Sequence, residues 1–268
     1  MRNFHQQKVL ITGGASGIGK IMSGLFLDYG ARVIIWDIDP IAIKAIVDEF
    51  AQRGEIHGYS VDIADQTKVQ RAFEKVKANH GVIDVLINNA GIVVGKYFHE
   101  HTELDIRRTM DINALAPMYI TSLFLPDMIA QNNGSICNIA SSASYISNPK
   151  MSVYVASKWS IFGWSDSLRI EMKLLQKNIR VTTVTPYYIN TGMFDGVRSL
   201  VPILRPEKVA KKILRGIASG KPIVSMPWSI HFVRFFQGIF PIRFFDWFVG
   251  GVLGIYKTMD NFKGRQNT

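Results

Sequence analysis

Short apolar runs alternate with longer amphipathic segments along most of this chain. The runs are rich in Val and Ile, as buried strands are, and lie at residues 8–12, 32–36, 55–61, 82–88, 134–140 and 179–185. Between them, apolar residues recur every three or four positions, which is typical of helices that pack against a core. These helices are predicted at about residues 17–30, 41–53, 65–80, 103–116, 117–131, 155–175 and 205–220.

Strands that alternate with helices predict a parallel sheet with helices on both faces, an α/β, doubly wound fold of the Rossmann type. With 268 residues and no linker-like segment, the chain is predicted to form one domain. We expect residues 1–197 to form its dinucleotide-binding and catalytic body, and residues 198–268 a hydrophobic, basic C-terminal extension of the same domain. Ligands bind beyond the carboxyl ends of parallel strands, so the residues that follow predicted strands are candidates: Asp62, Asn89, Ser141 and Pro186.

A glycine-rich segment follows the first predicted strand, with glycines at positions 13, 17 and 19 in the spacing G-x-x-x-G-x-G. A helix, a second strand and Asp37 come next, which is the order of a dinucleotide-binding unit with the pyrophosphate at the helix N-terminus. The Asp37 carboxylate can accept hydrogen bonds from both adenosine ribose hydroxyls and would repel a 2′-phosphate, so the predicted cofactor is NAD rather than NADP. Lys20, a cation near the turn, is a weak indication of NADP, but we expect its side chain to be solvated.

Tyr154 and Lys158 lie four residues apart, one turn along the same face of a predicted helix. An ammonium group beside a phenol favours the tyrosinate form, so we expect the pKa of Tyr154 to fall from about 10 toward working pH. Such a pair is also common on helix surfaces, and the pair alone leaves that alternative open.

Cys137 is the single cysteine, and its apolar neighbours indicate that it fills the core. A chain with one cysteine forms no internal disulfide, which suits a reducing compartment, so we expect a cytoplasmic protein. The first apolar run is too short for a signal peptide, and no run of about 18 uncharged apolar residues predicts a spanning helix.

Positive charge is concentrated in the extension. The chain has a net charge of +10; residues 198–268 hold 12 Lys and Arg against 3 acidic residues, while residues 1–197 hold 19 against 18. The segment 228–256 is also dense in aromatic residues, with Arg234 and Arg243 between them. Two interpretations stay open: these aromatics close the pocket or an oligomer interface, or they lie in a bilayer interface with the cations on anionic headgroups. A nucleic-acid partner is not expected, because the cations are sparse among Phe, Trp and Ile.

Several motifs together resemble the short-chain dehydrogenase/reductase family over roughly residues 6–195. The motifs are TGGASGIG at 12–19, Asp62-Ile63, NNAG at 88–91, Asn113, Ser141, Tyr154-x-x-x-Lys158 and Pro186-x-x-x-x-Thr191. Less specifically, the segments 186–194, 228–256 and 256–265 are similar to the branch that holds retinol dehydrogenases and 17-beta-hydroxysteroid dehydrogenases. The family usually has glycine after the proline, whereas this chain has Tyr187, so we expect a reshaped substrate side.

The resemblance implies a role for each matching residue. Tyr154 would exchange the substrate proton, Lys158 would lower its pKa and bind the nicotinamide ribose, Ser141 would polarise the carbonyl, and Asn113 would hold a water against Lys158. The implied cofactor-binding residues, none of them a metal ligand, are Gly13, Ser16, Gly17, Ile18, Gly19, Asp37, Asp62, Ile63, Asn89, Ala90, Gly91, Tyr154, Lys158, Pro186, Ile189 and Thr191. The pocket walls are expected from residues 93–98, 142–151, 187–204 and the tail, with Ser142, Ser144 and Ser152 in solvated loop.

The implied activity is NAD-dependent interconversion of a lipophilic alcohol, of retinoid, steroid or long-chain type, and its carbonyl. A reductase of keto-lipid or acyl intermediates is an alternative, and a membrane-docking scaffold with an inactive body is a more distant one. The resemblance also implies a homodimer or tetramer that pairs through the helices at 103–131 and 155–175. Any membrane attachment is expected from the tail.

Overall fold

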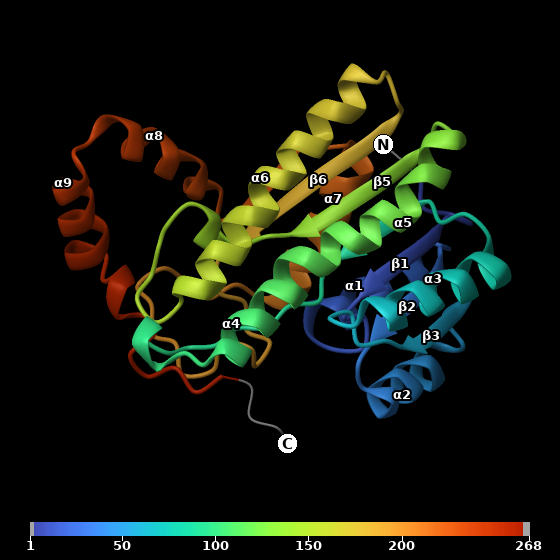
Figure 1. The fold of residues 1–268 in the computed structure, drawn as a ribbon, viewed down its shortest axis with the longest axis horizontal. Coiled ribbons are helices and arrows are strands. Elements are labelled where there is room, and N and C mark those ends of the chain that lie inside the picture. The colour runs from blue at the N-terminus through green and yellow to red at the C-terminus, as the bar shows by residue number, and fades with distance from the viewer. Residues whose placement is uncertain (1–2, 265–268) are drawn as a thin grey trace.

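The computed structural model describes residues 3–264, so position 265 of the closing segment lies outside the described residues. Its strands form one parallel sheet in the order β3-β2-β1-β4-β5-β6-β7 (Figure 1), which confirms the predicted doubly wound α/β fold. The strands are β1 (Lys8–Thr12), β2 (Arg32–Asp37), β3 (Ile56–Ser60), β4 (Val85–Asn88), β5 (Gly134–Ile139), β6 (Ile179–Pro186) and β7 (Ile223–Met226). The order reverses between β1 and β4, and ligands of such sheets bind at this reversal.

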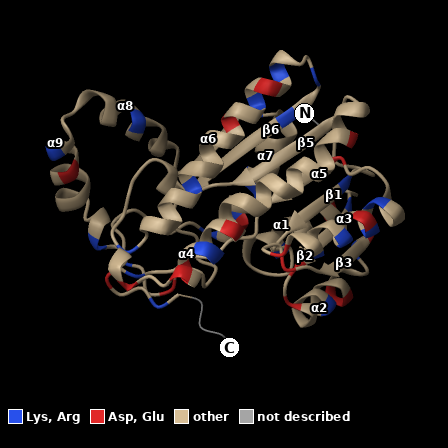
Figure 2. Cartoon of the chain, in the orientation of Figure 1, with Lys and Arg blue, Asp and Glu red and all other residues tan. Residues whose placement is uncertain are grey.

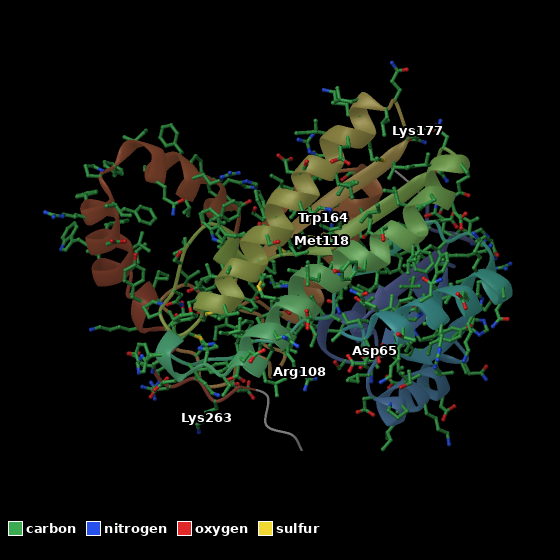
Figure 3. All side chains as sticks on the ribbon, viewed as in Figure 1. Asp65, Arg108, Met118, Trp164, Lys177 and Lys263 are labelled. Atoms are coloured by element: carbon green, nitrogen blue, oxygen red, sulfur yellow. The ribbon has the colours of Figure 1, made fainter. Side chains whose placement is uncertain are left out.

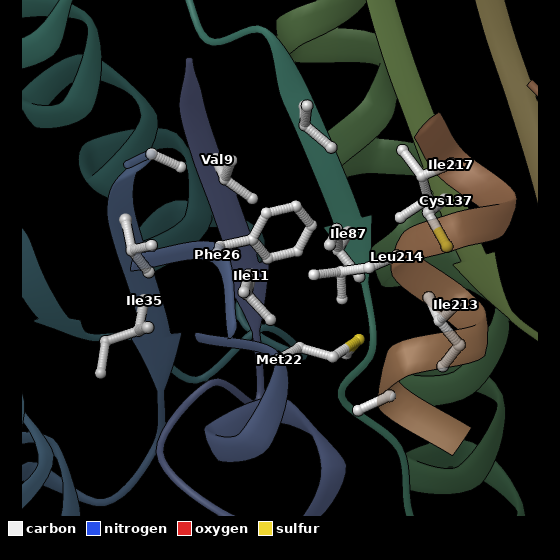
Figure 4. Packing of buried hydrophobic residues seen from close by; sticks show 14 of the residues in the cluster. Val9, Ile11, Met22, Phe26, Ile35, Ile87, Cys137, Ile213, Leu214 and Ile217 are labelled. Atoms are coloured by element: carbon white, nitrogen blue, oxygen red, sulfur yellow. The ribbon is translucent and has the colours of Figure 1, made fainter. Parts of the chain in front are cut away.

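Helices cover both faces of the sheet. The first face is covered by α1 (Gly17–Asp28), α2 (Pro40–Phe50) and α7 (Pro206–Ser219), and the second by α3 (Gln66–His80), α5 (Ala116–Ala130) and α6 (Ser152–Leu174). Successive side chains of a strand point to opposite faces, so Val9 and Ile11 pack in the first layer and Leu10 in the second. Figure 4 shows the first layer, where Met22 and Phe26 of α1 meet the strands.

Aspartates set the starts of two helices. The Asp39 carboxylate accepts hydrogen bonds from the backbone N–H groups of Ile41 and Ala42, at 2.9 and 3.1 Å, and Pro40 occupies the first helical position. Asp65 does the same for α3. Both helices therefore begin within one residue of the predicted boundary, because a side-chain cap satisfies N–H groups that have no partner inside the helix.

The two helices predicted at 103–116 and 117–131 form one continuous run: α4 (Glu103–Met110), a π-helical turn (Asp111–Leu115) and α5. In length and hydropathy the run Glu103–Ala130 is the one described helix that could cross a membrane, but half of its apolar window is buried. Ile120, Phe124 and Met128 of this window pack against the second face of the sheet. The run is thus a core helix of this fold.

Besides the helices after residue 230, which were not predicted, two elements differ from the sequence prediction. Helix α6 begins at Ser152, so Tyr154 lies within its first turn. Strand β7, which was not predicted, has only four residues and pairs with β6. It lies beyond residue 197, so the sheet takes its last strand from the predicted extension. Cys137 is fully buried, as predicted, and burial raises the pKa of its thiol.

After β7, the chain leaves the sheet. Helices α8 (His231–Ile239) and α9 (Ile242–Asp246) extend to one side of the body (Figure 1, orange to red). A π-helical turn (Trp247–Val252) and a 3-10 turn (Ile255–Lys257) bring the chain back. A third cluster of buried side chains, separate from the two sheet layers, joins this returning segment to the carboxyl edge of the sheet through Tyr154, Tyr188, Ile255 and Met259.

Close packing of α1 against the glycine-rich turn yields a stability prediction. A Cβ at position 19 would overlap the carbonyl oxygen of Gly13 and lie 2.8 Å from Nδ2 of Asn89. Gly19→Ala should therefore lower the midpoint of thermal unfolding by several degrees, measured by circular dichroism. Gly163→Ala in α6 is the control: no described heavy atom lies within 4 Å of its added methyl group. Its midpoint should stay level or rise, since alanine favours a helix by about 1 kcal/mol over glycine; equal effects of both changes would contradict the packing argument.

Candidate active site

The glycine-rich turn forms a cradle at the carboxyl end of β1. Gly13 has a φ of +64°, and an added Cβ there would lie 3.0 Å from Cα of Ala90. Asn89, just after β4, donates from Nδ2 to the carbonyl oxygens of Thr12 (2.9 Å) and Gly13 (3.1 Å). Helix α1 begins at Gly17, so the N–H groups of its first turn face the same opening. The contacts of Gly13 and Asn89 thus fix the conformation of the turn, and the N-terminus of α1 beside it can bind an anion.

Asp37, the last residue of β2, lies beside the glycine-rich turn. Its Oδ2 accepts a hydrogen bond from the backbone N–H of Ala15 at 3.0 Å, while Oδ1 has only a long contact of 3.4 Å with the N–H of Asp39. One carboxylate oxygen thus remains available to a ligand hydroxyl. Lys20, which in the sequence was a weak indication of NADP, forms an exposed ion pair with Glu49 at 2.6 Å. That pairing engages its ammonium group on the surface.

Three polar side chains meet where β5 ends against α6. Lys158 donates from Nζ to the carbonyl oxygen of Ile139 at 2.8 Å, and its Nζ lies 5.7 Å from the ring centroid of Tyr154. Ser141 lies close enough to Tyr154 to act on the pKa of its phenol, and Oγ of Ser141 accepts from the N–H of Ala143 at 3.1 Å. Tyr154 and Lys158 are each 5% exposed, so the surface-pair alternative is excluded.

Burial shifts the pKa values of this group in opposite directions. It raises the pKa of Tyr154 to about 12, although the Ser141 side chain acts to lower it. It lowers the pKa of Lys158 to about 8. The expectation that Lys158 lowers the pKa of Tyr154 was therefore wrong for the cofactor-free protein, because desolvation, which disfavours the charged form of each group, is the largest cause of both shifts. The phenol of Tyr154 is therefore neutral at neutral pH.

Asn113 lies in the π-helical turn, a feature that is frequent at functional sites. Its Oδ1 accepts from the N–H of Ile92, and its Nδ2 donates to the carbonyl oxygen of Ile92, both at 2.8 Å. The same Nδ2 also donates to Oγ of Ser157 in α6, at 3.1 Å. The side chain thus fixes the segment after β4 against α6, and its role in holding a water remains a prediction.

Aromatic side chains form the wall opposite these polar groups. The Phe194 ring lies edge-on to Tyr154, with centroids 6.0 Å apart, and to Tyr188, at 5.0 Å. Tyr187, which stands where the family usually has glycine, also lines the cavity, and its hydroxyl is hydrogen-bonded to Oγ of Ser199 at 2.8 Å. Burial raises the pKa of Tyr187 to about 12. The substrate side is therefore lined largely by aromatic rings.

The cavity, of about 300 Å³, is continuous from the glycine-rich turn to this aromatic wall. It is lined by most of the predicted site residues: Gly13, Ser16, Gly17, Ile18, Asp37, Asp62, Ile63, Asn89, Ala90, Gly91, Ser141, Tyr154, Lys158, Pro186, Ile189 and Thr191. Gly19 and Asn113 are not among the lining residues and support the wall through their contacts.

Some site residues were missed or misplaced by the sequence. Arg108 of α4 lines the cavity and is labelled in Figure 3, yet a lone cation on a helix looks solvated in the sequence. The only available signal was its position one turn before Ile112, which also lines the cavity. The solvated-loop interpretation was wrong for Ser142 and Ser144, which are buried. Ser144 donates from Oγ to the backbone oxygen of Lys158 at 2.7 Å.

Comparison with known proteins gives this arrangement a family. The family model described as "short chain dehydrogenase" matches residues 7–200. The chain belongs to the short-chain dehydrogenase family. Its relatives include the epidermal retinol dehydrogenase 2 of Mus musculus, 33% identical over 272 residues, with 99% of this chain and 88% of the relative covered. The estradiol 17-beta-dehydrogenase 11 of Homo sapiens is 31% identical over 239 residues, with 88% and 80% covered.

Solved structures show the same fold. A short chain dehydrogenase/reductase from Burkholderia phymatum, in complex with NAD, superposes with a TM-score of 0.82 at 22% identity, covering 89% of this chain and 95% of the other. A metagenomic short-chain oxidoreductase, in complex with NADP, has a TM-score of 0.73 at 27% identity, covering 84% and 98%. The protein is thus an oxidoreductase related to retinol and steroid dehydrogenases, which confirms the resemblance found in its sequence.

Short-chain dehydrogenases use a nicotinamide cofactor, and the described residues fit one. The cradle at Gly13 leaves backbone room for a pyrophosphate at the start of α1, and Asp37 offers a free carboxylate oxygen at the adenosine end. At the other end, the cavity reaches Tyr154 and Lys158. A cofactor bound along it would place its reactive ring beside the polar group of this short-chain dehydrogenase.

The depressed pKa of Lys158 predicts how stability depends on pH. Between pH 8 and 10.5, the unfolded chain keeps a proton on Lys158 that the folded protein has lost, so the free energy of unfolding should rise with pH. Lys158→Met removes this contribution and leaves the other titrating groups in place. Urea unfolding of both cofactor-free proteins should show the wild type gaining about 2 kcal/mol relative to Lys158→Met between pH 7 and 10. Parallel pH profiles of the two proteins would contradict the assigned burial of the ammonium group.

Proposed function

We propose that this protein is an NAD-dependent dehydrogenase that interconverts a lipophilic alcohol, of retinoid, steroid or long-chain type, and its carbonyl. The observation that carries the proposal is the buried group of Tyr154, Ser141 and Lys158 at the junction of the glycine-rich cradle and an aromatic wall. Relatives named as retinol and estradiol dehydrogenases support the class of substrate.

The three side chains divide the proton chemistry. When bound, the cofactor supplies or accepts the hydride, which is its own chemistry. Tyr154 exchanges the proton of the substrate oxygen, as donor in reduction and, once ionised, as acceptor in oxidation. Lys158, largely protonated below its pKa of about 8, favours the ionised phenol. Ser141 donates to the substrate oxygen as negative charge develops there. Asn113 keeps α6 in place behind them.

The choice of NAD rests on Asp37. Its free oxygen can accept from a ribose hydroxyl, whereas a 2′-phosphate at the same place would meet a carboxylate. Lys20, the cation close to the turn in sequence, is engaged by Glu49. Of the described residues that line the cavity, only Arg108 and Lys158 carry a positive charge, and Lys158 lies at the catalytic end.

A reductase of keto-lipid or acyl intermediates would use the same residues in reverse and remains the alternative. The scaffold alternative has less support, because the buried polar group is complete. We also propose a homo-oligomer that pairs through the run Glu103–Ala130 and α6, where Leu115, Tyr119 and Trp159 are exposed. A buried free thiol at Cys137 agrees with the proposed cytoplasmic location.

Tyr154→Phe tests the proposed acid/base role. Loss of the hydroxyl should lower kcat by about 10²–10⁴-fold, the usual contribution of a positioned acid or base. The dissociation constant for NAD, measured by calorimetry, should stay within about twofold, because the phenyl ring keeps the packing against Phe194. Tyr29→Phe on the exposed end of α1 is the matched control and should turn over like the wild type. Undiminished turnover by Tyr154→Phe would remove the acid/base role.

Asp37→Ser tests the cofactor choice. Without the carboxylate, repulsion of a 2′-phosphate disappears, and a hydrogen bond to the ribose is weakened. The ratio of kcat/KM for NAD to that for NADP should fall by about tenfold or more. Asp48→Asn, an exposed acid of α2, should leave the ratio unchanged. A wild-type enzyme that prefers NADP would overturn the assignment of Asp37.

A further inference from the structure

Residues 228–252, called the arm below, carry an unusual amount of exposed apolar surface. Helices α8 and α9 lie wholly within the described residues, and neither contains a buried side chain. Trp228, Phe235, Ile242 and Trp247 are 67%, 61%, 76% and 61% exposed. The other exposed large apolar residues of the arm are Phe232, Phe236, Ile239, Phe240, Phe244, Phe248 and Val252. Soluble proteins rarely expose a contiguous apolar patch of this kind without a partner.

The exposed rings of the arm contact one another. Phe236 stacks on Phe240 with centroids 5.8 Å apart, Phe240 contacts Phe244 at 4.8 Å, and Phe244 contacts Trp247 at 5.7 Å. A continuous row of rings therefore joins α8, α9 and the turn that follows. Gly238, beside this row, has no described heavy atom within 4 Å of a Cβ built on it.

The inner side of the arm is fixed to the body. Gln237 donates from Nε2 to the backbone oxygen of Tyr145 at 2.7 Å. The guanidinium group of Arg234 lies over the rings of Phe162, at 5.2 Å, and Tyr145, at 5.8 Å. Val233 and Phe245 pack against the third core cluster. The exposed rings thus belong to the outer side of a positioned element.

Charge on the arm is sparse and mainly positive (Figure 2). Arg234 and Arg243 are exposed, and neither forms an ion pair with a carboxylate in the described part of the chain. Asp246 is the arm's acidic residue, and its carboxylate accepts a hydrogen bond from the Tyr256 hydroxyl. Aromatic rings flanked by cations match the boundary of a bilayer, where the rings reach the acyl chains and the cations meet anionic headgroups.

We propose that the outer side of the arm docks this protein on the surface of an anionic lipid bilayer. A second copy of the chain fits the arm less well than lipid does. A two-fold interface through the outer side of the arm would bring the unpaired Arg243 of both copies into one apolar contact, with Asp246 already engaged by Tyr256. Headgroup phosphates and carboxylates supply the negative charge that the arm itself lacks.

The arm also leads directly to the cavity. After it, Ile255 lines the cavity wall, and Oγ1 of Thr258 accepts from Nδ2 of Asn148 at 2.8 Å. The Tyr188 hydroxyl lies 3.0 Å from the same Oγ1, and both Asn148 and Tyr188 line the cavity. Docking would therefore hold the substrate end of the cavity near the lipid, from which a lipophilic alcohol could enter. This last step rests on the proposed function, whereas docking does not.

Vesicle flotation of the full chain tests the docking. Phosphatidylcholine vesicles with about one quarter phosphatidylserine should carry the wild type upward, and vesicles of phosphatidylcholine alone should carry less. The variant Phe235→Ser/Ile242→Ser/Trp247→Ser should bind the anionic vesicles at least about tenfold more weakly, since interfacial affinity scales with buried apolar area. The matched control, Ile41→Ser/Leu174→Ser/Leu175→Ser, changes side chains that are 80%, 76% and 58% exposed on other elements and should float like the wild type.

A charge variant and two readouts complete the test. Arg243→Glu should weaken flotation on anionic vesicles, while Lys44→Glu on α2 should not. Unchanged unfolding midpoints and NAD dissociation constants will show that each variant is folded. Brominated lipids should quench the fluorescence of the wild type, and much less that of Trp228→Phe/Trp247→Phe.

Three results would overturn the docking proposal: no flotation of the wild type, equal flotation of the arm and control variants, or conversion of an oligomer to a monomer by the arm variant without any lipid binding. The last would assign the arm to self-association. Tyr154→Phe should float like the wild type because the assay needs no turnover. Failure of the proposed catalysis and failure of docking are therefore distinguishable.

Discussion

The active site depends on the requirement that polar groups inside the protein find hydrogen-bond partners. Asn88 at the end of β4 donates to Oδ1 of Asn138 in β5 at 2.7 Å, and Asn138 donates to Oγ of Ser165 in α6 at 2.8 Å. A buried amide left without partners costs free energy, so this chain of bonds specifies how β4, β5 and α6 sit together. Asn113 adds a second tie between the β4 exit and α6 through Ser157. Together they place Lys158 against the last carbonyl of β5.

The same burial that orders these groups sets their chemistry. A phenol removed from water stays neutral over a wide pH range, and an amine removed from water loses its proton more easily. In the cofactor-free protein, each effect acts against the charged pair that the spacing of Tyr154 and Lys158 indicates. Catalysis as proposed therefore needs the bound state, in which hydrogen bonds and charges within the filled cavity favour the ionised forms. The side chains of the site are thus positioned in the cofactor-free protein, whereas the ionised forms are favoured only once the cavity is filled.

The third core cluster connects this chemistry to the arm. It includes Tyr154, Phe194, Tyr188 and Ile255, so Tyr154 and the returning segment after the arm share one set of apolar contacts. The two core clusters on the faces of the sheet contain no residue of the arm, so the outer side of the arm does not contribute to them. So many exposed aromatic side chains indicate that the arm binds to a surface. In the proposed arrangement, that surface is the source of the substrate.

Local patterns in the sequence were enough for strands β1 to β6, for helices α1 to α7 and for the glycine-rich turn. The apolar run of β1 and the spacing of Gly13, Gly17 and Gly19 are short-range features that can be found in the sequence alone. The Asp39 and Asp65 caps also lie within three residues of the N–H groups they satisfy. For the same reason, nearly all predicted cofactor residues line the cavity, since they follow strands whose ends meet at one edge.

Tertiary structure alone decided the rest, because it depends on distance through space. The burial of Tyr154 and Lys158, and hence the direction of their pKa shifts, comes from elements far away in sequence. Arg108 became a cavity residue only when α4 folded beside the β4 exit, and β7 became a strand only beside β6. The aromatic tail was visible in the sequence, but whether its rings faced inward or outward was a matter of packing. The desolvation of a side chain and its tertiary contacts depend on residues that are distant in sequence, so no local sequence pattern specifies them.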